Sequence, residues 1–155
     1  MTAGGRRQPG PWRGAALGAV LLGLLLPAAA AAAARDITFD DLKFALKKGA
    51  AFQRTLLTPK IERLDTQRIR IRGYILPTFQ QDGITQFVLV RDNQQCCFGP
   101  GAALYDCILV EMAAGQTTSF SVRPVAVEGV FRIKPYLGPD NKPLAVYRLE
   151  AFAVR

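Results

Sequence analysis

The sequence contains no histidine among its 155 residues. Without an imidazole, the chain cannot form Ser–His or Cys–His nucleophile pairs, bind catalytic zinc through histidine or use histidine as a general acid or base. It also lacks both common glycine-rich phosphate loops, G-x-G-x-x-G and the Walker pattern. The adjacent carboxylates Asp40 and Asp41 are better explained as helix-capping residues. We therefore expect a protein that is not an enzyme.

Acidic residues are absent before Asp36, whereas three arginines lie near the start of the chain. An apolar run follows over residues 15–26, and Pro27 leads into an unbroken alanine stretch, the kind of small residue that signal peptidase accepts before its cut. This pattern predicts a cleavable signal peptide over residues 1–34 and a single β-rich domain over residues 35–155. The apolar core, of about 12 residues, is shorter than the ~20 that span a bilayer as a helix. We expect an exported, periplasmic protein, with a secreted or N-terminally anchored one as the alternatives.

Loss of the leader lowers the formal charge of the chain. The leader holds three of the 20 basic residues and none of the 12 acidic ones, so the charge changes from +8 to 17 minus 12, or +5. A modest positive charge favours contact with acidic lipid headgroups or polyanions and does not by itself indicate nucleic acid.

One helix and five strands are predicted along the remaining chain. Thr38 can cap a helix that has Asp40 and Asp41 in its first turn and Lys47 and Lys48 in its last, an arrangement that favours the helix dipole. Apolar alternation and turn residues place strands at 68–76, 84–91, 106–112, 125–133 and 144–154. The fold class is mainly β: a small five-stranded, partly open OB-like barrel with one N-terminal helix. A five- or six-stranded sheet with the helix on one side is the alternative.

The three cysteines fall within one strand–loop–strand unit. Cys96 and Cys97 are adjacent in the loop, and Cys107 follows Asp106 near the start of the third strand. A bridge between Cys96 and Cys97 is disfavoured because neighbouring Cα atoms lie about 3.8 Å apart. A bridge from either residue to Cys107, with Cys97 to Cys107 as our candidate disulfide, would close a loop of about 11 residues and stabilise by roughly 3 kcal/mol.

Other roles for the same sulfur atoms remain open. Three thiolates with Asp106 would suit a soft metal such as Zn²⁺ or Cu(I), so Cys96, Cys97, Cys107 and Asp106 are candidate metal ligands. The thiols could also be buried and inert. A redox pair is a further alternative, although the C-x-x-C spacing at a helix N-terminus is missing.

A basic stripe is expected on the first strand. Period-2 alternation turns Arg68, Arg70, Arg72 and Tyr74 to one face of residues 68–76. This face could bind phosphates or an acidic partner, or it could be an ordinary solvated strand face.

Several segments resemble a known family. The segments at 36–42, 69–77 and 87–91, together with Cys-Cys-Phe-Gly-Pro at 96–100, are similar to the exported bacterial domain-of-unknown-function family 3299. The resemblance spans almost the whole mature chain, and its most specific element is the segment at 96–100. It implies a small periplasmic protein that accompanies ABC-type transport systems, some of them tied to metal handling. It also places Cys96, Cys97 and Asp106 in the family's signature, whereas Cys107 stands where a large residue is expected.

Three hypotheses follow for the function. The leading one is a non-enzymatic periplasmic binding or accessory module that uses the Cys96–Cys97 loop to bind a soft metal or to contact a partner, possible partners being an ABC-type transporter or another envelope protein. The second is a thiol–disulfide redox protein in which Cys107 is the resolving thiol. The third is a structural module that docks to an acidic membrane or partner subunit through its arginine face.

Overall fold

The computed structural model describes residue 1 and residues 33–46, 51–76, 79–92 and 103–155. By its internal contacts the chain divides into two units, Met1–Ala30 and Ala31–Arg155. The second unit contains every described helix and strand. No helix within the described ranges is long and apolar enough to cross a membrane.

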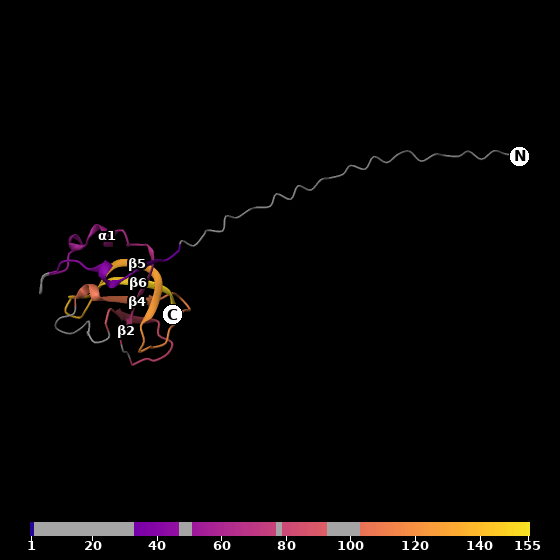
Figure 1. Cartoon of the computed structure of the whole chain (residues 1–155). Helices are drawn as coiled ribbons and strands as arrows, with labels where there is room; N and C mark the ends of the chain where they lie inside the picture. Colours follow the sequence, from indigo (N-terminus) through magenta and orange to yellow (C-terminus); the bar gives the residue numbers. More distant parts are fainter. Residues whose placement is uncertain (2–32, 47–50, 77–78, 93–102) are drawn as a thin grey trace. The chain divides into compact units, whose positions relative to one another are not determined.

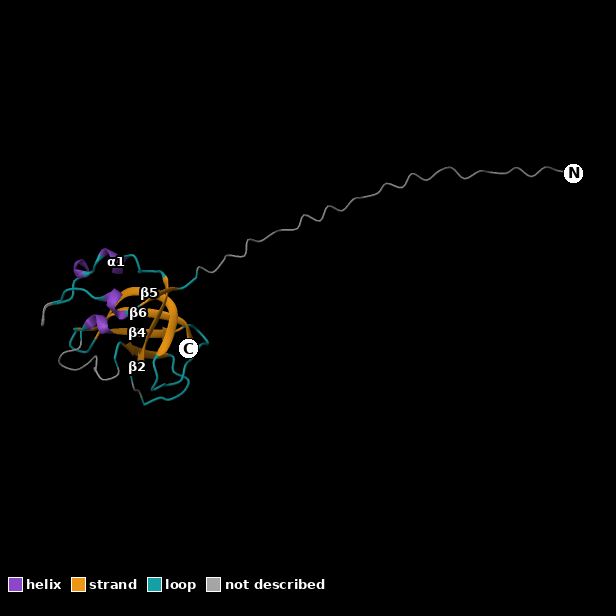
Figure 2. Cartoon of the chain, in the orientation of Figure 1, coloured by secondary structure: helices purple, strands orange, loops and turns teal. Residues whose placement is uncertain are grey.

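The second unit is mainly β (Figure 2). Its one α-helix, α1, is a single turn at Pro59–Glu62, and short 3₁₀ helices occupy Phe39–Leu42, Arg54–Leu56 and Leu104–Asp106. The strands are β1 (Arg35–Ile37), β2 (Arg68–Ile75), β3 (Gln86–Val90), β4 (Cys107–Met112), β5 (Val125–Leu137) and β6 (Pro143–Val154).

The strands form a six-stranded mixed sheet in the order β1-β2-β3-β4-β6-β5, and a further pairing of β5 with β2 joins them into a ring (Figure 1). Neighbours are antiparallel except for β1 with β2 and β4 with β6. One edge of β2 is shared, because β1 pairs with its residues 69–71 and β3 with its residues 74 and 75. β2 therefore has partners on both edges.

All five predicted strands are present, and the expectation of five strands in total is wrong by one. The additional strand is β1, whose three residues pair with Ile69, Arg70 and Ile71. A segment of three residues is too short to produce a recognisable alternation, so its strand conformation depends on the neighbour β2.

The predicted N-terminal helix is also shorter than expected. Thr38 is its N-cap as predicted, in a capping box in which the Asp41 carboxylate accepts a hydrogen bond of 2.8 Å from the Thr38 backbone N–H. The 3₁₀ helix nevertheless ends at Leu42, and Lys43 is extended. Phe44 is buried against Phe52, Tyr105 and Tyr147. Burial of this aromatic side chain outweighs the helix signals here. The predicted end of the helix, at residues 47–49, lies outside the described residues.

The core lies inside the ring. It takes the inward residues of every long strand, and the segment around Phe39–Leu42 covers it at one end. The buried hydroxyl of Tyr147 donates a hydrogen bond of 2.7 Å to the carbonyl oxygen of Leu42, which ties that segment to β6. A side chain that points away from the core on these strands must therefore face outward.

Gly73 allows β2 to approach its neighbours closely. A Cβ atom at this position would lie 2.6 Å from the carbonyl oxygen of Val90 and 3.0 Å from side-chain atoms of Leu89 and Phe39. Real Cβ atoms do not approach a backbone oxygen so closely. The glycine in mid-strand thus permits the contact between β2, β3 and the capping 3₁₀ helix.

We expect Gly73→Ala to lower the free energy of unfolding by about 1–3 kcal/mol, because the added methyl group must displace the backbone of β3. Urea unfolding followed by far-ultraviolet circular dichroism measures the change. A variant as stable as the wild type would show that β2 and β3 are not packed so closely.

Candidate functional site

The outward face of β2 carries the predicted arginine stripe. Ile69 and Ile71 are buried in the core, at 0% and 1% exposure, and this orients Arg68, Arg70 and Arg72 outward as predicted. Opposite them on β5, in register, lie Val130, Glu128 and Ala126. Pairing with β5 holds the backbones of all three arginines in place, and Arg70 is paired with β1 as well.

Glu128 is the centre of this face. The Nε and Nη2 atoms of Arg68 donate to its Oε1 at 2.9 and 2.6 Å, and Nη2 of Arg70 donates to its Oε2 at 3.2 Å. Glu128 as a whole residue is 7% exposed, and it is the one buried charged residue within the described ranges. The hydrogen bond from Arg68, aided by Arg70, holds the pKa of Glu128 below its ordinary value despite its burial. Glu128 is therefore an anion at neutral pH that binds two of the arginines.

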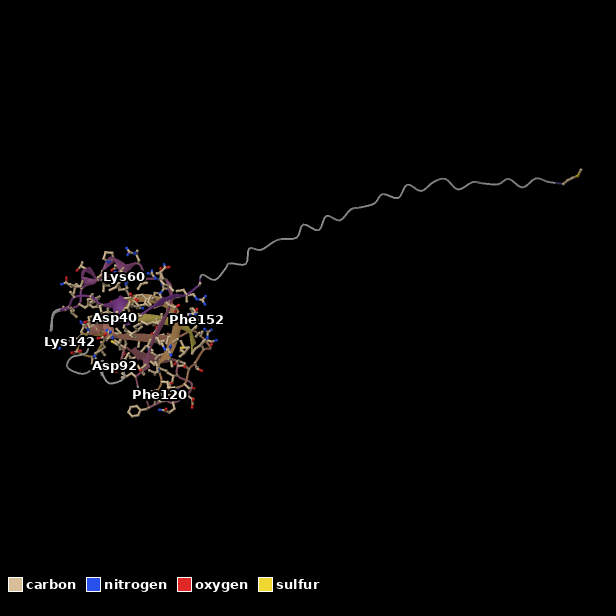
Figure 3. The ribbon with its side chains drawn as sticks, in the orientation of Figure 1. Asp40, Lys60, Asp92, Phe120, Lys142 and Phe152 are labelled. Carbon is tan, nitrogen blue, oxygen red and sulfur yellow. The ribbon has the colours of Figure 1, made fainter. Side chains whose placement is uncertain are left out.

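The C-terminal end of the chain adds to the same cluster. The Arg68 guanidinium lies 4.5 Å from the centre of the Phe152 ring, in cation–π geometry. Arg155 exchanges two backbone hydrogen bonds with Ala126, of 2.7 and 3.0 Å, and its Nη1 lies 3.9 Å from Oε2 of Glu128. Phe152 is labelled in Figure 3.

The face keeps an excess of positive charge. Its negative side chains are Glu128 and the exposed Asp36, whose carboxylate lies 3.5 Å from Arg70. Its positive side chains are Arg68, Arg70, Arg72 and Arg155, so four side-chain charges less two leave +2. Arg72 is exposed and has no ion pair with any residue in the described ranges. We name the four arginines with Glu128 the arginine face.

Tyr74 has a different environment from the arginines. It is half-buried and packs against a small apolar cluster of Val90, Cys107 and Ala145, outside the main core. The polar stripe predicted for β2 is therefore positive as far as Arg72 and becomes apolar at Tyr74.

Sequence reasoning missed Glu128, Phe152 and Arg155. The hydrogen-bonded pair Arg68 and Glu128 are 60 residues apart, so only the register between β2 and β5 brings them together. A weak signal existed: Glu128 is the one acidic residue in the mostly apolar predicted strand at 125–133, whose other charged residue is Arg132.

The predicted sulfur site rests mainly on residues that the structure does not describe. Cys96 and Cys97 lie outside the described residues, and so does one half of the candidate bridge from Cys97 to Cys107. Cys107 is buried at 1% exposure, and its Sγ atom lies 3.4 Å from the carbonyl oxygen of Leu144. Asp106 forms an ion pair with Arg91, in which its Oδ1 atom lies 3.6 Å from Nη1. Within the described part of the chain, no three Cys, Asp or Glu side chains gather as metal ligands would.

Comparison with known proteins identifies the family. The sequence model of the family described as "Protein of unknown function (DUF3299)" matches residues 25–155, so the chain belongs to this family. The crystal structure of a DUF3299 family protein from Pseudomonas aeruginosa PAO1 is similar to it, with a TM-score of 0.53 and 20% sequence identity over 79% of this chain and 95% of that one. This likeness concerns the fold alone. No curated protein matches the chain.

We expect Glu128→Gln to lower stability at neutral pH, because it removes the charge that binds Arg68 and Arg70. The depressed pKa of Glu128 means that its contribution is complete above the ordinary value of 4.5 and is lost as the pH falls through its folded-state pKa. The difference in free energy of unfolding between wild type and variant, measured by urea unfolding, should therefore be full at pH 7 and shrink as the pH falls below about 5. A difference that stays constant with pH would contradict an ionised Glu128. The pairwise comparison removes the effects of other carboxyls with lowered pKa, such as Asp40 and Asp41.

We expect the Cys107 thiol to react slowly in the folded protein because it is buried. Alkylation with iodoacetamide, located on Cys107 by tandem mass spectrometry, should be about 100-fold slower in buffer than in urea. Equal rates in the two conditions would show an accessible thiol and would favour the redox hypothesis.

Proposed function

We propose that this DUF3299 protein is a non-enzymatic, exported binding module that docks to an acidic partner through the arginine face. The observation that carries the proposal is that its arginines fall into two pairs with different environments. Glu128 binds Arg68 and Arg70, whereas the side chains of Arg72 and Arg155 are exposed, the latter at 73%. The first pair holds the strands together and the second pair is available to a partner.

The architecture supports a docking role. Five of the strands, β2, β3, β4, β6 and β5, follow one another around the ring, and Gly73 lets the first of them lie close against Val90. We infer a small, partly open OB-like barrel with β1 added at one edge. Barrels of this kind bind their ligands on outward strand faces and the adjoining loops, so an outward charged face suits them.

The hypotheses based on sulfur have less support from the described residues. A soft-metal site for Zn²⁺ or Cu(I), in an accessory protein of an ABC-type transport system, would need Cys96 and Cys97 as its first ligands. A redox role would need Cys107 as the resolving thiol, yet this side chain is buried. Both stay predictions that depend on the loop between β3 and β4.

We expect Arg72→Glu to weaken binding of the protein to poly-L-glutamate, a defined acidic polymer, by about tenfold at low salt. The exposed side chain makes no ion pair with the described residues, so the variant should fold normally. Fluorescence anisotropy of labelled poly-L-glutamate measures the affinity.

Lys134→Glu is the matched control. It makes the same change of charge at an exposed position towards the other end of β5. An equal loss of affinity in both variants would mean that only net charge matters, and the arginine face would then not be a binding site.

A further inference from the structure

Two loop segments lie side by side at one end of the ring. One is residues 79–85, which lead into β3, and the other is residues 113–124, between β4 and β5. Ile84 and Thr118 exchange backbone hydrogen bonds of 2.9 and 3.0 Å, and the Phe120 N–H donates to the carbonyl oxygen of Gln81 at 2.8 Å. The Ser119 hydroxyl adds a hydrogen bond of 2.6 Å to the Asp82 carboxylate. These contacts join the two loops into one structure, which we name the double loop.

The double loop exposes apolar side chains. Phe79, two residues before Gln81, is 110% exposed, and Val122, two residues after Phe120, is 77% exposed. Phe120 itself is half-buried and packs against the core, so it anchors the loop rather than covering these residues. In Figure 3, Phe120 lies well apart from Lys60 and Asp40. Two exposed apolar side chains therefore extend from loops that are hydrogen-bonded to each other.

The surroundings of these side chains are basic. Arg123 directly follows Val122 and is exposed. Val125 pairs with Gly73, and Ala126 pairs with both Arg72 and Arg155, so the arginine face begins where the double loop joins β5. Asp82 is the one acidic residue within residues 79–85 and 113–124, and Ser119 already donates to it.

Exposed apolar residues beside arginines match the chemistry of an anionic bilayer surface. The apolar side chains can enter the boundary between headgroups and acyl chains while the guanidinium groups remain with the lipid phosphates. A folded protein partner would instead call for a groove or a larger apolar patch, whereas the double loop exposes two large apolar side chains, Phe79 and Val122. The combination favours a lipid surface.

We propose that the double loop docks on the surface of an anionic lipid bilayer. Phe79 and Val122 enter the headgroup boundary, and Arg72, Arg123 and Arg155 contact lipid phosphates. The inference rests on the proposed function, since it names the acidic partner of the arginine face, and it adds residues that the arginine face does not contain.

The test is co-sedimentation of the exported protein with vesicles of phosphatidylcholine, with or without phosphatidylglycerol. Every described helix and strand belongs to Ala31–Arg155, so removal of the leader leaves the ring complete. We expect binding only to vesicles that contain phosphatidylglycerol. The double variant Phe79→Ser, Val122→Ser should bind them about tenfold more weakly while its affinity for poly-L-glutamate stays unchanged.

Leu137→Ser is the matched control, because Leu137 is 49% exposed at the far end of β5. Equal sedimentation of the wild type and the double variant, or equal binding to neutral and anionic vesicles, would overturn the membrane proposal. Binding of the wild type to poly-L-glutamate without binding to vesicles would also overturn it, and would leave the proposed function intact with an acidic protein as partner. Failure to bind either probe would overturn both proposals.

Discussion

The structure depends on one strand, β2, which has partners on both edges and two unlike faces. Its isoleucines at 69, 71 and 75 are buried, and the alternation of a strand turns the intervening arginines outward. Gly73 allows this strand to lie against Val90 and Phe39 at a distance that a side chain would prevent. Because the isoleucines of β2 must be buried inside the ring, the arginines between them must lie on its surface.

Positive charges held this close together repel one another, and Glu128 offsets the repulsion. It is buried, accepts hydrogen bonds from Arg68 and Arg70, and stays ionised because these guanidinium groups favour its charged form. A buried carboxylate of this kind connects β2 to β5 and leaves Arg72 and Arg155 without a comparable anchor. Under the proposed function, stability and binding therefore use different arginines of one face.

Most of the fold could be predicted from the sequence, and the site only in part. Alternation at 68–76 identified both the strand and the direction of its arginines, because period 2 in the sequence is period 2 in space. The helix signals after Thr38 were overridden by the burial of Phe44, and β1 was too short to show a pattern. Glu128 was missed because its partner on β2 is 60 residues away and only strand register joins them.

The most direct measurement is the change in backbone amide chemical shifts as poly-L-glutamate is added to the isotope-labelled protein. We expect the largest changes at Arg72, Ala126 and Arg155, where exposed arginines flank the β2–β5 pairing. Leu137, at the far end of β5, should change little. Changes concentrated around Leu137, or spread evenly over the surface, would contradict the claim that the arginine face is the binding site.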